Sequence, residues 1–271
     1  MIAAVIHKSW RDSWMLLVVA FLALISFEML VVRALSELPA DSARMWLERP
    51  LLRDFMRVLL GADLAAALTP TGLMTVGFGH PFVYALTWAI LVTLCTRTTV
   101  GEIDRGTADL LLSLPSSRAA IFLGTSSVWV LAGIPVCLGP LIGIWIGERW
   151  CPLWEPVNFG RLMVVSVNLW LLYLCVGGLT VFVSGLVIRR GNAIAAVLAI
   201  VLASVLLNFI AMLWPAAERV AFLGILHYYR PLPCIRSEDW PLSDMLVLGT
   251  VAALGWMLGM WRFCRRDIPA A

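Results

Sequence analysis

Charge is what this sequence has least of. Only 14% of its 271 residues are charged and 61% are hydrophobic, whereas about 25% are charged in an ordinary soluble domain. A soluble fold of this length must cover its surface with polar groups, and this chain has too few of them. The shortage excludes an ordinary soluble enzyme and predicts a polytopic integral membrane protein.

Lysine is almost absent, because Lys8 is the only one in the chain. A P-loop holds phosphates with Gly-Lys-Ser/Thr, and Lys8 follows His7. Any nucleotide energy must therefore come from another chain. The formal net charge of +3 is too small an excess to indicate nucleic-acid binding.

Patterns for catalysis and metal binding are also lacking. The three histidines, His7, His80 and His227, lie in separate segments without Cys or carboxylates at ligand spacing. No Ser-His-Asp, paired-carboxylate or Cys-His arrangement stands out. We expect no catalytic residue, no metal and no cofactor bound by this chain itself.

Long apolar runs are what the sequence does have. A helix crosses about 30 Å of hydrocarbon with roughly 20 residues, because it rises about 1.5 Å per residue. The runs predict an all-α fold with six transmembrane helices in a single membrane domain, residues 1–271. The predicted spans are residues 15–35, 81–96, 119–146, 162–188, 193–214 and 242–263.

Residues 1–14 precede the first span and mix His7, Lys8 and Arg11 with Ile, Val and Trp. This pattern predicts a helix lying in the membrane interface. The alternative is a signal peptide, which needs a shorter apolar core and an Ala-x-Ala-like cleavage site.

Arginine placement predicts the orientation. With the N-terminus inside, the inner segments are short and basic, and the longer outer segments hold most of the acids. The positive-inside rule then favours both termini in the cytoplasm, with the chain in the cell membrane. The largest outer loop is residues 36–80, and residues 50–60 within it have the periodicity of a short amphipathic helix, for which simple loop packing and a substrate role both remain open.

The cytoplasmic segment 97–118 is the most informative stretch. It begins with alternating charges, and Thr107 can cap a short helix. Pro115 ends that helix, and Arg118 begins the next one at the membrane surface. The spacing predicts a short amphipathic helix suited to docking against a soluble partner. Its apolar face consists of Leu110, Leu111 and Leu114.

This segment resembles the permease subunits of ABC-2 type exporters. Their pattern is Glu-x-x-x-Gly-Thr-x-x-x-Leu-Leu-x-x-Pro-x-x-Arg, followed by a membrane span. The layout is also similar, with an interfacial N-terminal helix, six spans, a large first outer loop and a short basic tail. The residues that carry the resemblance are Glu102, Gly106, Thr107, Leu111, Leu112, Pro115 and Arg118.

The resemblance implies that the segment is a coupling helix. It would sit in a groove of a separate ATPase subunit that binds ATP-Mg, and two permeases would pair with two ATPases. The second permease is then either a copy of this chain or a paralogue. ATP-driven closure of the ATPases would move the spans between inward-facing and outward-facing states. The implied coupling residues are Glu102, Gly106, Thr107, Leu110, Leu111, Leu114, Pro115 and Arg118.

Two rival classes are a membrane-embedded enzyme and an ion-coupled transporter. The enzyme needs carboxylates or histidines that converge at one membrane depth, and the ion-coupled transporter usually has repeat symmetry and midplane charges. The deep parts of the spans lack acids in this reading. Glu28 and Arg33 are five residues apart, too poorly spaced to pair, and we expect them to end the first span near the outer surface.

Small residues recur at Gly139, Gly143 and Gly147, and again at Gly255 and Gly259. Such spacing lets helix backbones approach closely in lipid. Packing within the chain is favoured over a seam between two copies.

Cys151 and Cys234 are the two cysteines in predicted outer loops, and each adjoins a proline. Both would face an oxidising compartment, where disulfides persist. A bond between them and two free cysteines that never approach are the two alternatives.

Overall fold

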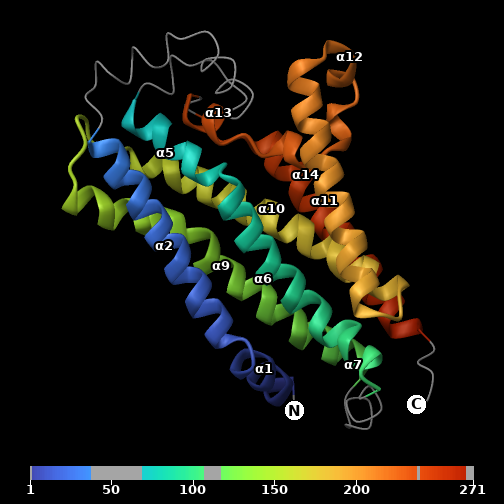
Figure 1. Ribbon diagram of the computed structural model, residues 1–271. Coiled ribbons are helices and arrows are strands. Elements are labelled where there is room, and N and C mark those ends of the chain that lie inside the picture. The colour runs from blue at the N-terminus through green and yellow to red at the C-terminus, as the bar shows by residue number, and fades with distance from the viewer. Residues whose placement is uncertain (1, 38–68, 107–116, 237–238, 267–271) are drawn as a thin grey trace.

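The computed structural model describes residues 2–37, 69–106, 117–236 and 239–266. Within these residues every regular element is a helix (Figure 1). The long helices are α2 (Trp14–Ser36), α6 (Pro81–Thr99), α9 (Arg118–Trp150), α10 (Phe159–Leu186), α11 (Arg190–Leu213) and α14 (Leu242–Arg265). The short ones are α1 (Ile2–Arg11), α5 (Pro70–Phe78), α7 (Gly101–Asp104), α12 (Pro215–Glu218), η2 (Ala221–Leu223), η3 (Ile225–Tyr228) and α13 (Pro231–Arg236).

Five of the described helices are long and apolar enough to cross a membrane: α2, α9, α10, α11 and α14. Large apolar side chains on their outer faces are exposed, as Leu30, Leu202 and Leu246 are. Exposed side chains of this kind suit contact with lipid. The prediction of an all-α, polytopic membrane protein is thus confirmed, and five of its six spans coincide with these helices.

The remaining predicted span lies in α6. This helix meets the criteria for a span only together with α5, from which it is bent by 41°. The pair is either one broken span or a re-entrant turn. A count of six spans therefore requires α5 and α6 to be taken as one.

Helix α5 corrects the expectation that residues 36–80 form one outer loop. It begins at Pro70, which suits a first helical position, and the Gly72 N–H donates to the Thr69 hydroxyl over 3.1 Å. Eight of its nine residues are buried. An apolar run this short is below the length of a span, which is why the sequence pattern alone assigns it to a loop. The amphipathic helix expected at residues 50–60 lies outside the described residues.

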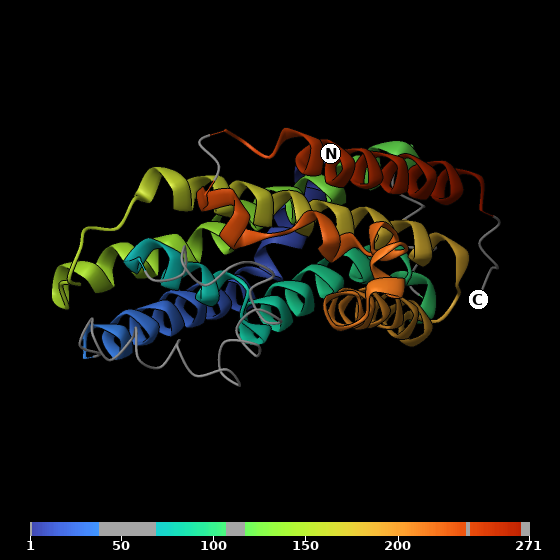
Figure 2. The same cartoon turned by 90° about the horizontal axis from the view of Figure 1, so that it is seen from above.

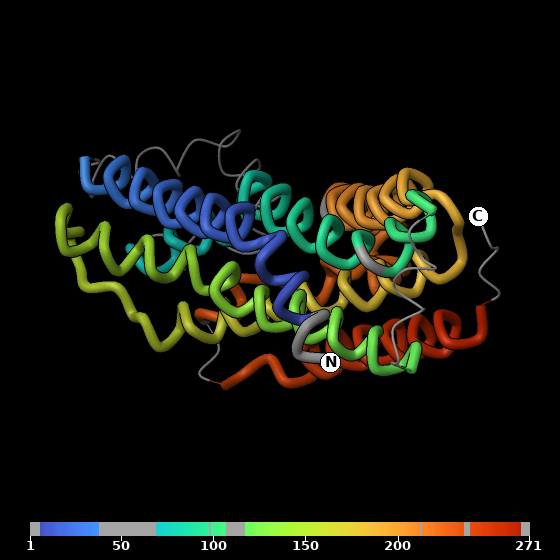
Figure 3. Tube along the Cα trace, turned by 90° about the horizontal axis from the view of Figure 1, so that it is seen from below, coloured from blue at the N-terminus to red at the C-terminus, as the bar shows by residue number. Residues whose placement is uncertain are grey.

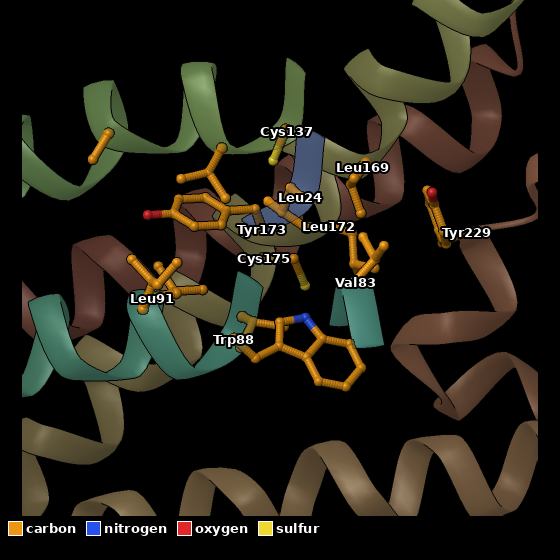
Figure 4. Packing of buried hydrophobic residues seen from close by; sticks show 14 of the residues in the cluster. Leu24, Val83, Trp88, Leu91, Cys137, Leu169, Leu172, Tyr173, Cys175 and Tyr229 are labelled. Carbon is orange, nitrogen blue, oxygen red and sulfur yellow. The ribbon is translucent and has the colours of Figure 1, made fainter. Parts of the chain in front are cut away.

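Helix α10 is the central element of the bundle. It packs against α14, α6, α9 and α11, and it is the most buried of the five candidate spans. The hydroxyl of Tyr173, on α10, donates to the carbonyl of Trp129 on α9 over 2.9 Å. Figure 4 shows the surrounding core, to which α10 contributes Leu169, Leu172, Tyr173 and Cys175, α2 contributes Leu24, α6 contributes Val83, Trp88 and Leu91, and α9 contributes Cys137.

Helices α10 and α14 lie side by side and touch through their backbones (Figure 2). A Cβ added to Gly178 would lie 2.4 Å from the Ala252 carbonyl oxygen, and one added to Gly255 would lie 2.7 Å from the Gly178 carbonyl carbon. No side chain fits in either place. The stripe at residues 255 and 259 therefore packs within the chain, as favoured from the sequence.

The second stripe packs in the same way against α2. A Cβ added to Gly143 would lie 2.6 Å from the Ile25 carbonyl oxygen, and one added to Gly147 would lie 2.9 Å from Val32. Both stripes are thus occupied inside the chain and are not free to form a seam with a second copy. Helix α1 turns away from α2 and packs across α9 (Figure 3).

We expect Gly255→Ala to destabilise the protein, because the new methyl group must push the α10 and α14 backbones apart. Overpacking of this kind costs about 1–3 kcal/mol. Gly249→Ala is the matched control on the same helix, since a Cβ there meets nothing within 4 Å. The measurement is the temperature at which each variant, in mild detergent, loses its monodisperse chromatographic peak.

The Gly249→Ala variant is expected to equal or slightly exceed the wild type, because alanine favours a helix over glycine by up to about 1 kcal/mol. Equal melting temperatures for Gly255→Ala and Gly249→Ala would contradict the contact between the two backbones.

Candidate functional site

Charged side chains from distant parts of the sequence meet at one end of the bundle, which we call the basal end. It comprises α1, α7, the first turns of α9 and α11, and the last turn of α14. Figure 1 shows both chain termini and α7 on this side. The opposite end, which carries α5, α12 and α13, is called the apical end.

Arg190 connects three helices at the basal end. Its backbone N–H donates to the Asp104 carboxylate on α7 over 3.3 Å. Its guanidinium donates to the Thr96 hydroxyl over 3.1 Å and to the Thr93 carbonyl over 3.4 Å, both on α6. A Cβ at Gly101 would be in ordinary contact with the Arg190 side chain at 3.5 Å and in tight contact with the Thr96 carbonyl oxygen at 3.1 Å. The hydrogen bonds of Arg190 hold the start of α11 against α6 and α7.

A second connection joins α6 to the corner between α1 and α2. Arg97 donates to the Asp12 carbonyl over 2.9 Å and to the Asp12 carboxylate over 3.1 Å. Both side chains are about one-third exposed, 33% for Arg97 and 36% for Asp12. Solvent screening limits what such a pair contributes to stability, so its main effect is to fix the position of the corner.

Two of the predicted coupling residues, Glu102 and Gly106, lie in or next to α7. Glu102 pairs with Arg105 over 2.8 Å on the same turn. Gly106 has a φ of 68°, in the left-handed region that glycine adopts without strain. Glycine therefore suits this position better than a residue with a side chain. Five predicted coupling residues lie outside the described part of the chain: Thr107, Leu110, Leu111, Leu114 and Pro115.

Arg118, the last predicted coupling residue, is the first residue of α9. The helix is capped by Ser117, whose hydroxyl accepts from the Ala120 N–H over 3.1 Å. Arg118 donates to the Arg266 carbonyl over 2.5 Å and to the Cys264 carbonyl over 3.4 Å, which connects α9 to the end of α14. The start of α9 was thus correctly predicted, and the contact with α14 was not.

Arg266 extends this connection to the central helix. Its guanidinium donates to the Ser184 carbonyl near the end of α10 over 3.3 Å. Partial burial, with a smaller contribution from the nearby Arg262, lowers the pKa of Arg266 from its ordinary value. The two sides of segment 107–116 are therefore held by different helices, α6 and α11 on one side and α9, α10 and α14 on the other.

A second polar feature lies toward the apical end. Glu28 is 0% exposed, and neither of its carboxylate oxygens has a hydrogen-bond partner among the described residues. The expectation that Glu28 ends the first span near the surface is wrong. Arg33 is exposed and pairs with Glu37 one turn further along α2, so Glu28 and Arg33 do not pair, as their spacing predicts.

Helices α5 and α9 enclose Glu28. A Cβ added to Gly77 on α5 would lie 2.3 Å from one carboxylate oxygen of Glu28, and one added to Gly143 on α9 would lie 2.8 Å from the Glu28 Cβ. The sequence carried a signal for this burial. Ala20, Leu24, Glu28 and Val32 recur every four residues, so they share the face of α2 that packs inward.

Of the two alternatives left open for Cys151 and Cys234, the structure has the two free cysteines. Cys151 ends α9, where its sulfur lies 3.8 Å from an Arg33 nitrogen. Cys234 belongs to α13 and is buried, with its sulfur 3.9 Å from the amide nitrogen of Asn168. The Cys151 sulfur thus lies beside α2 and the Cys234 sulfur beside α10, so the two are not brought together.

No group of three or more His, Cys, Asp or Glu residues in the described part of the chain could hold a metal ion. No known protein-family model matches the sequence, and no curated protein matches it.

We expect Arg190→Ala to loosen the basal end, because it removes both guanidinium hydrogen bonds to α6. The loss is about 1–3 kcal/mol. Arg189→Ala is the matched control, since Arg189 is exposed and the substitution removes the same charge. Hydrogen–deuterium exchange of residues 96–106 should accelerate in Arg190→Ala and stay at the wild-type rate in Arg189→Ala. The same exchange rate in both variants would contradict the role of Arg190.

We expect Cys151 to react with a maleimide without prior reduction, because it is free and partly exposed. The gel mobility of the protein should be the same with and without a reducing agent. A Cys151→Ser variant identifies the labelled site. Labelling that appears only after reduction would indicate that Cys151 forms a disulfide and would contradict the free thiol.

Proposed function

We propose that this chain is the transmembrane permease subunit of an ATP-driven, ABC-2 type exporter. A separate ATPase would bind ATP-Mg and supply the energy to move a substrate across the cell membrane. The observation that carries the proposal is the placement of the two described residues that flank segment 107–116. The segment joins two points, Gly106 and Arg118, that different groups of helices hold at the basal end.

Such a placement suits the transmission of force. On one side, α7 connects the segment to α6 directly and to α11 through Arg190. On the other side, Arg118 connects it to α14. A partner that pushes or turns the segment would act on both groups of helices at once. A change in their relative position is the kind of motion that alternates access across a membrane.

The resemblance in the sequence adds a second argument. Glu102, Gly106 and Arg118 occupy three positions of the ABC-2 pattern. The left-handed backbone at Gly106 gives a physical reason for glycine at that position. The family pattern implies two ATPases, and a second permease that is a copy or a paralogue.

The proposed orientation puts the basal end in the cytoplasm, together with both termini. Arginines are concentrated there, including Arg97, Arg105, Arg118, Arg190 and Arg266. The positive-inside rule favours this orientation, and a soluble ATPase would need it.

An ion-coupled transporter is the second candidate, and Glu28 is the observation that favours it. A fully buried acid inside a candidate span is rare and often functional. The two candidates differ in energy source, so stimulation of an ATPase separates them. A membrane-embedded enzyme is the third alternative, and it has no group of convergent acids or histidines in its favour within the described residues.

We expect Leu111→Asp to uncouple the transporter. A charge within an apolar docking face costs several kcal/mol by desolvation, which corresponds to at least a tenfold weaker complex. Ser113→Asp is the matched control, because it adds the same charge to the same segment at a position outside the Leu110, Leu111 and Leu114 face. The measurement is co-purification of a nucleotide-binding protein from the native host, followed by the ATPase rate of the complex.

The wild type and Ser113→Asp should retain the ATPase and its stimulation, while Leu111→Asp should lose both and still insert into the membrane. Normal coupling in Leu111→Asp would show that this face does not dock. Absence of any nucleotide-binding protein from repeated wild-type purifications would contradict the proposal as a whole.

A further inference from the structure

Glu28 carries a buried carboxyl group to which the proposed function assigns no role. An ionised carboxylate that is removed from water without a partner is strongly destabilised, and more so within a membrane. Both Glu28 oxygens are buried and unpartnered among the described residues. The group must therefore be neutral in this arrangement, or a cation must lie beside it.

The contact with α5 closely covers one side of the carboxyl group. The backbone of Gly77 lies against the carboxyl group so closely that an added Cβ would be 2.3 and 2.4 Å from its two oxygens. On α9, Gly143 approaches the Cβ of the same residue. Between the carboxyl group and the Gly77 backbone there is no space for a metal ion, whereas a proton needs none.

Among the described residues, no lysine or arginine forms a hydrogen bond or ion pair with Glu28. Helix α5 has no ionisable residue, and Cys137 is the buried ionisable group of α9. At the start of α6 lie His80 and Tyr84; the His80 ring packs on Phe27 and its Nδ1 accepts from the Phe82 N–H. Tyr229 lies on the other side of α5, where its hydroxyl donates to the Phe78 carbonyl over 3.4 Å.

The pKa of Tyr229 reflects the same surroundings. Its pKa is raised well above the ordinary value, first because the hydroxyl is buried, and then through Tyr84, Cys234, Cys137 and Glu28. Apart from His80, the described ionisable groups close to Glu28 are thus neutral acids or other potential anions. None of them favours the ionised form of Glu28.

We propose that Glu28 is a proton-binding site whose occupancy depends on the position of α5. With α5 packed against α2 and α9, as here, the carboxyl group holds its proton. When α5 separates from α2, water reaches the group, the O–H bond breaks, and the proton passes to that water and leaves a carboxylate. The proposal does not depend on the ATPase, because it rests on the contacts of Glu28 alone.

Linkage gives the sign of the pH effect. A proton that binds the packed arrangement more tightly must stabilise that arrangement, by the same free energy by which packing favours proton binding. Low pH therefore holds α5 in place, and rising pH favours its separation. Since α5 continues into α6 through a 41° bend, movement of α5 would act on a helix that reaches the basal end.

Dicyclohexylcarbodiimide tests the protonation state, because it reacts with neutral carboxylic acids in apolar surroundings. The intact chain is treated in detergent at neutral pH, and the modified acids are identified by mass spectrometry of its peptides. We expect an adduct on Glu28 and none on Glu37, which is exposed on the same helix. The adduct should diminish as the pH rises and should be absent from Glu28→Gln.

Equal modification of Glu28 and Glu37 would overturn the proposal. Protection of Glu28 by sodium or an organic ammonium ion at constant pH would also overturn it, because the site would then bind a cation other than a proton.

A second measurement tests the link to α5. Met74 on α5 is fully buried, so Met74→Cys reports the position of the helix through its reactivity with a thiol reagent. We expect this reactivity, relative to that of Cys151 in the same molecule, to rise several-fold from pH 6 to pH 9 when Glu28 is present. Glu28→Gln imitates the neutral acid and should abolish the rise. An identical pH profile in both backgrounds would show that Glu28 does not control α5.

Discussion

The contact between the backbones of α10 and α14 is the constraint on which the arrangement of the other helices depends. Within lipid, apolar helices gain little from leaving their surroundings, so close van der Waals packing and small residues must hold them together. Gly178 and Gly255 permit that packing. It fixes α14 on one side of α10 and leaves the remaining faces of α10 to α6, α9 and α11.

Helix α6 connects the two polar features of this bundle. At its start it adjoins α5, whose backbone covers Glu28; at its end, Thr93 and Thr96 accept from Arg190 while Arg97 reaches Asp12. A displacement of α6 along its axis would therefore change contacts at both ends of the molecule. This arrangement gives a physical route by which events at the basal end and the position of α5 could influence one another.

Long apolar runs allowed the sequence to predict most of the fold, since five predicted spans coincide with observed helices. Helix α5 escaped prediction because a nine-residue stretch with two threonines and two glycines resembles a loop when its burial is unknown. Glu28 was expected near the surface because glutamate is usually charged. Its four-residue spacing from Leu24 and Val32 instead indicates the inward face of α2. The contacts of Arg118 and Arg190 join residues up to 148 positions apart, and no local pattern encodes such pairs. The sequence left the pairing of Cys151 and Cys234 open for the same reason.

The central claim is that segment 107–116 transmits force from a soluble ATPase. Its most direct test is a photo-crosslinking amino acid at position 111, activated in intact cells of the native host, with the adducts identified by mass spectrometry. The account predicts a covalent adduct with a soluble nucleotide-binding protein, and a much weaker one when the same amino acid replaces Ser113. Adducts with lipid alone, or with equal yield at both positions, would contradict it.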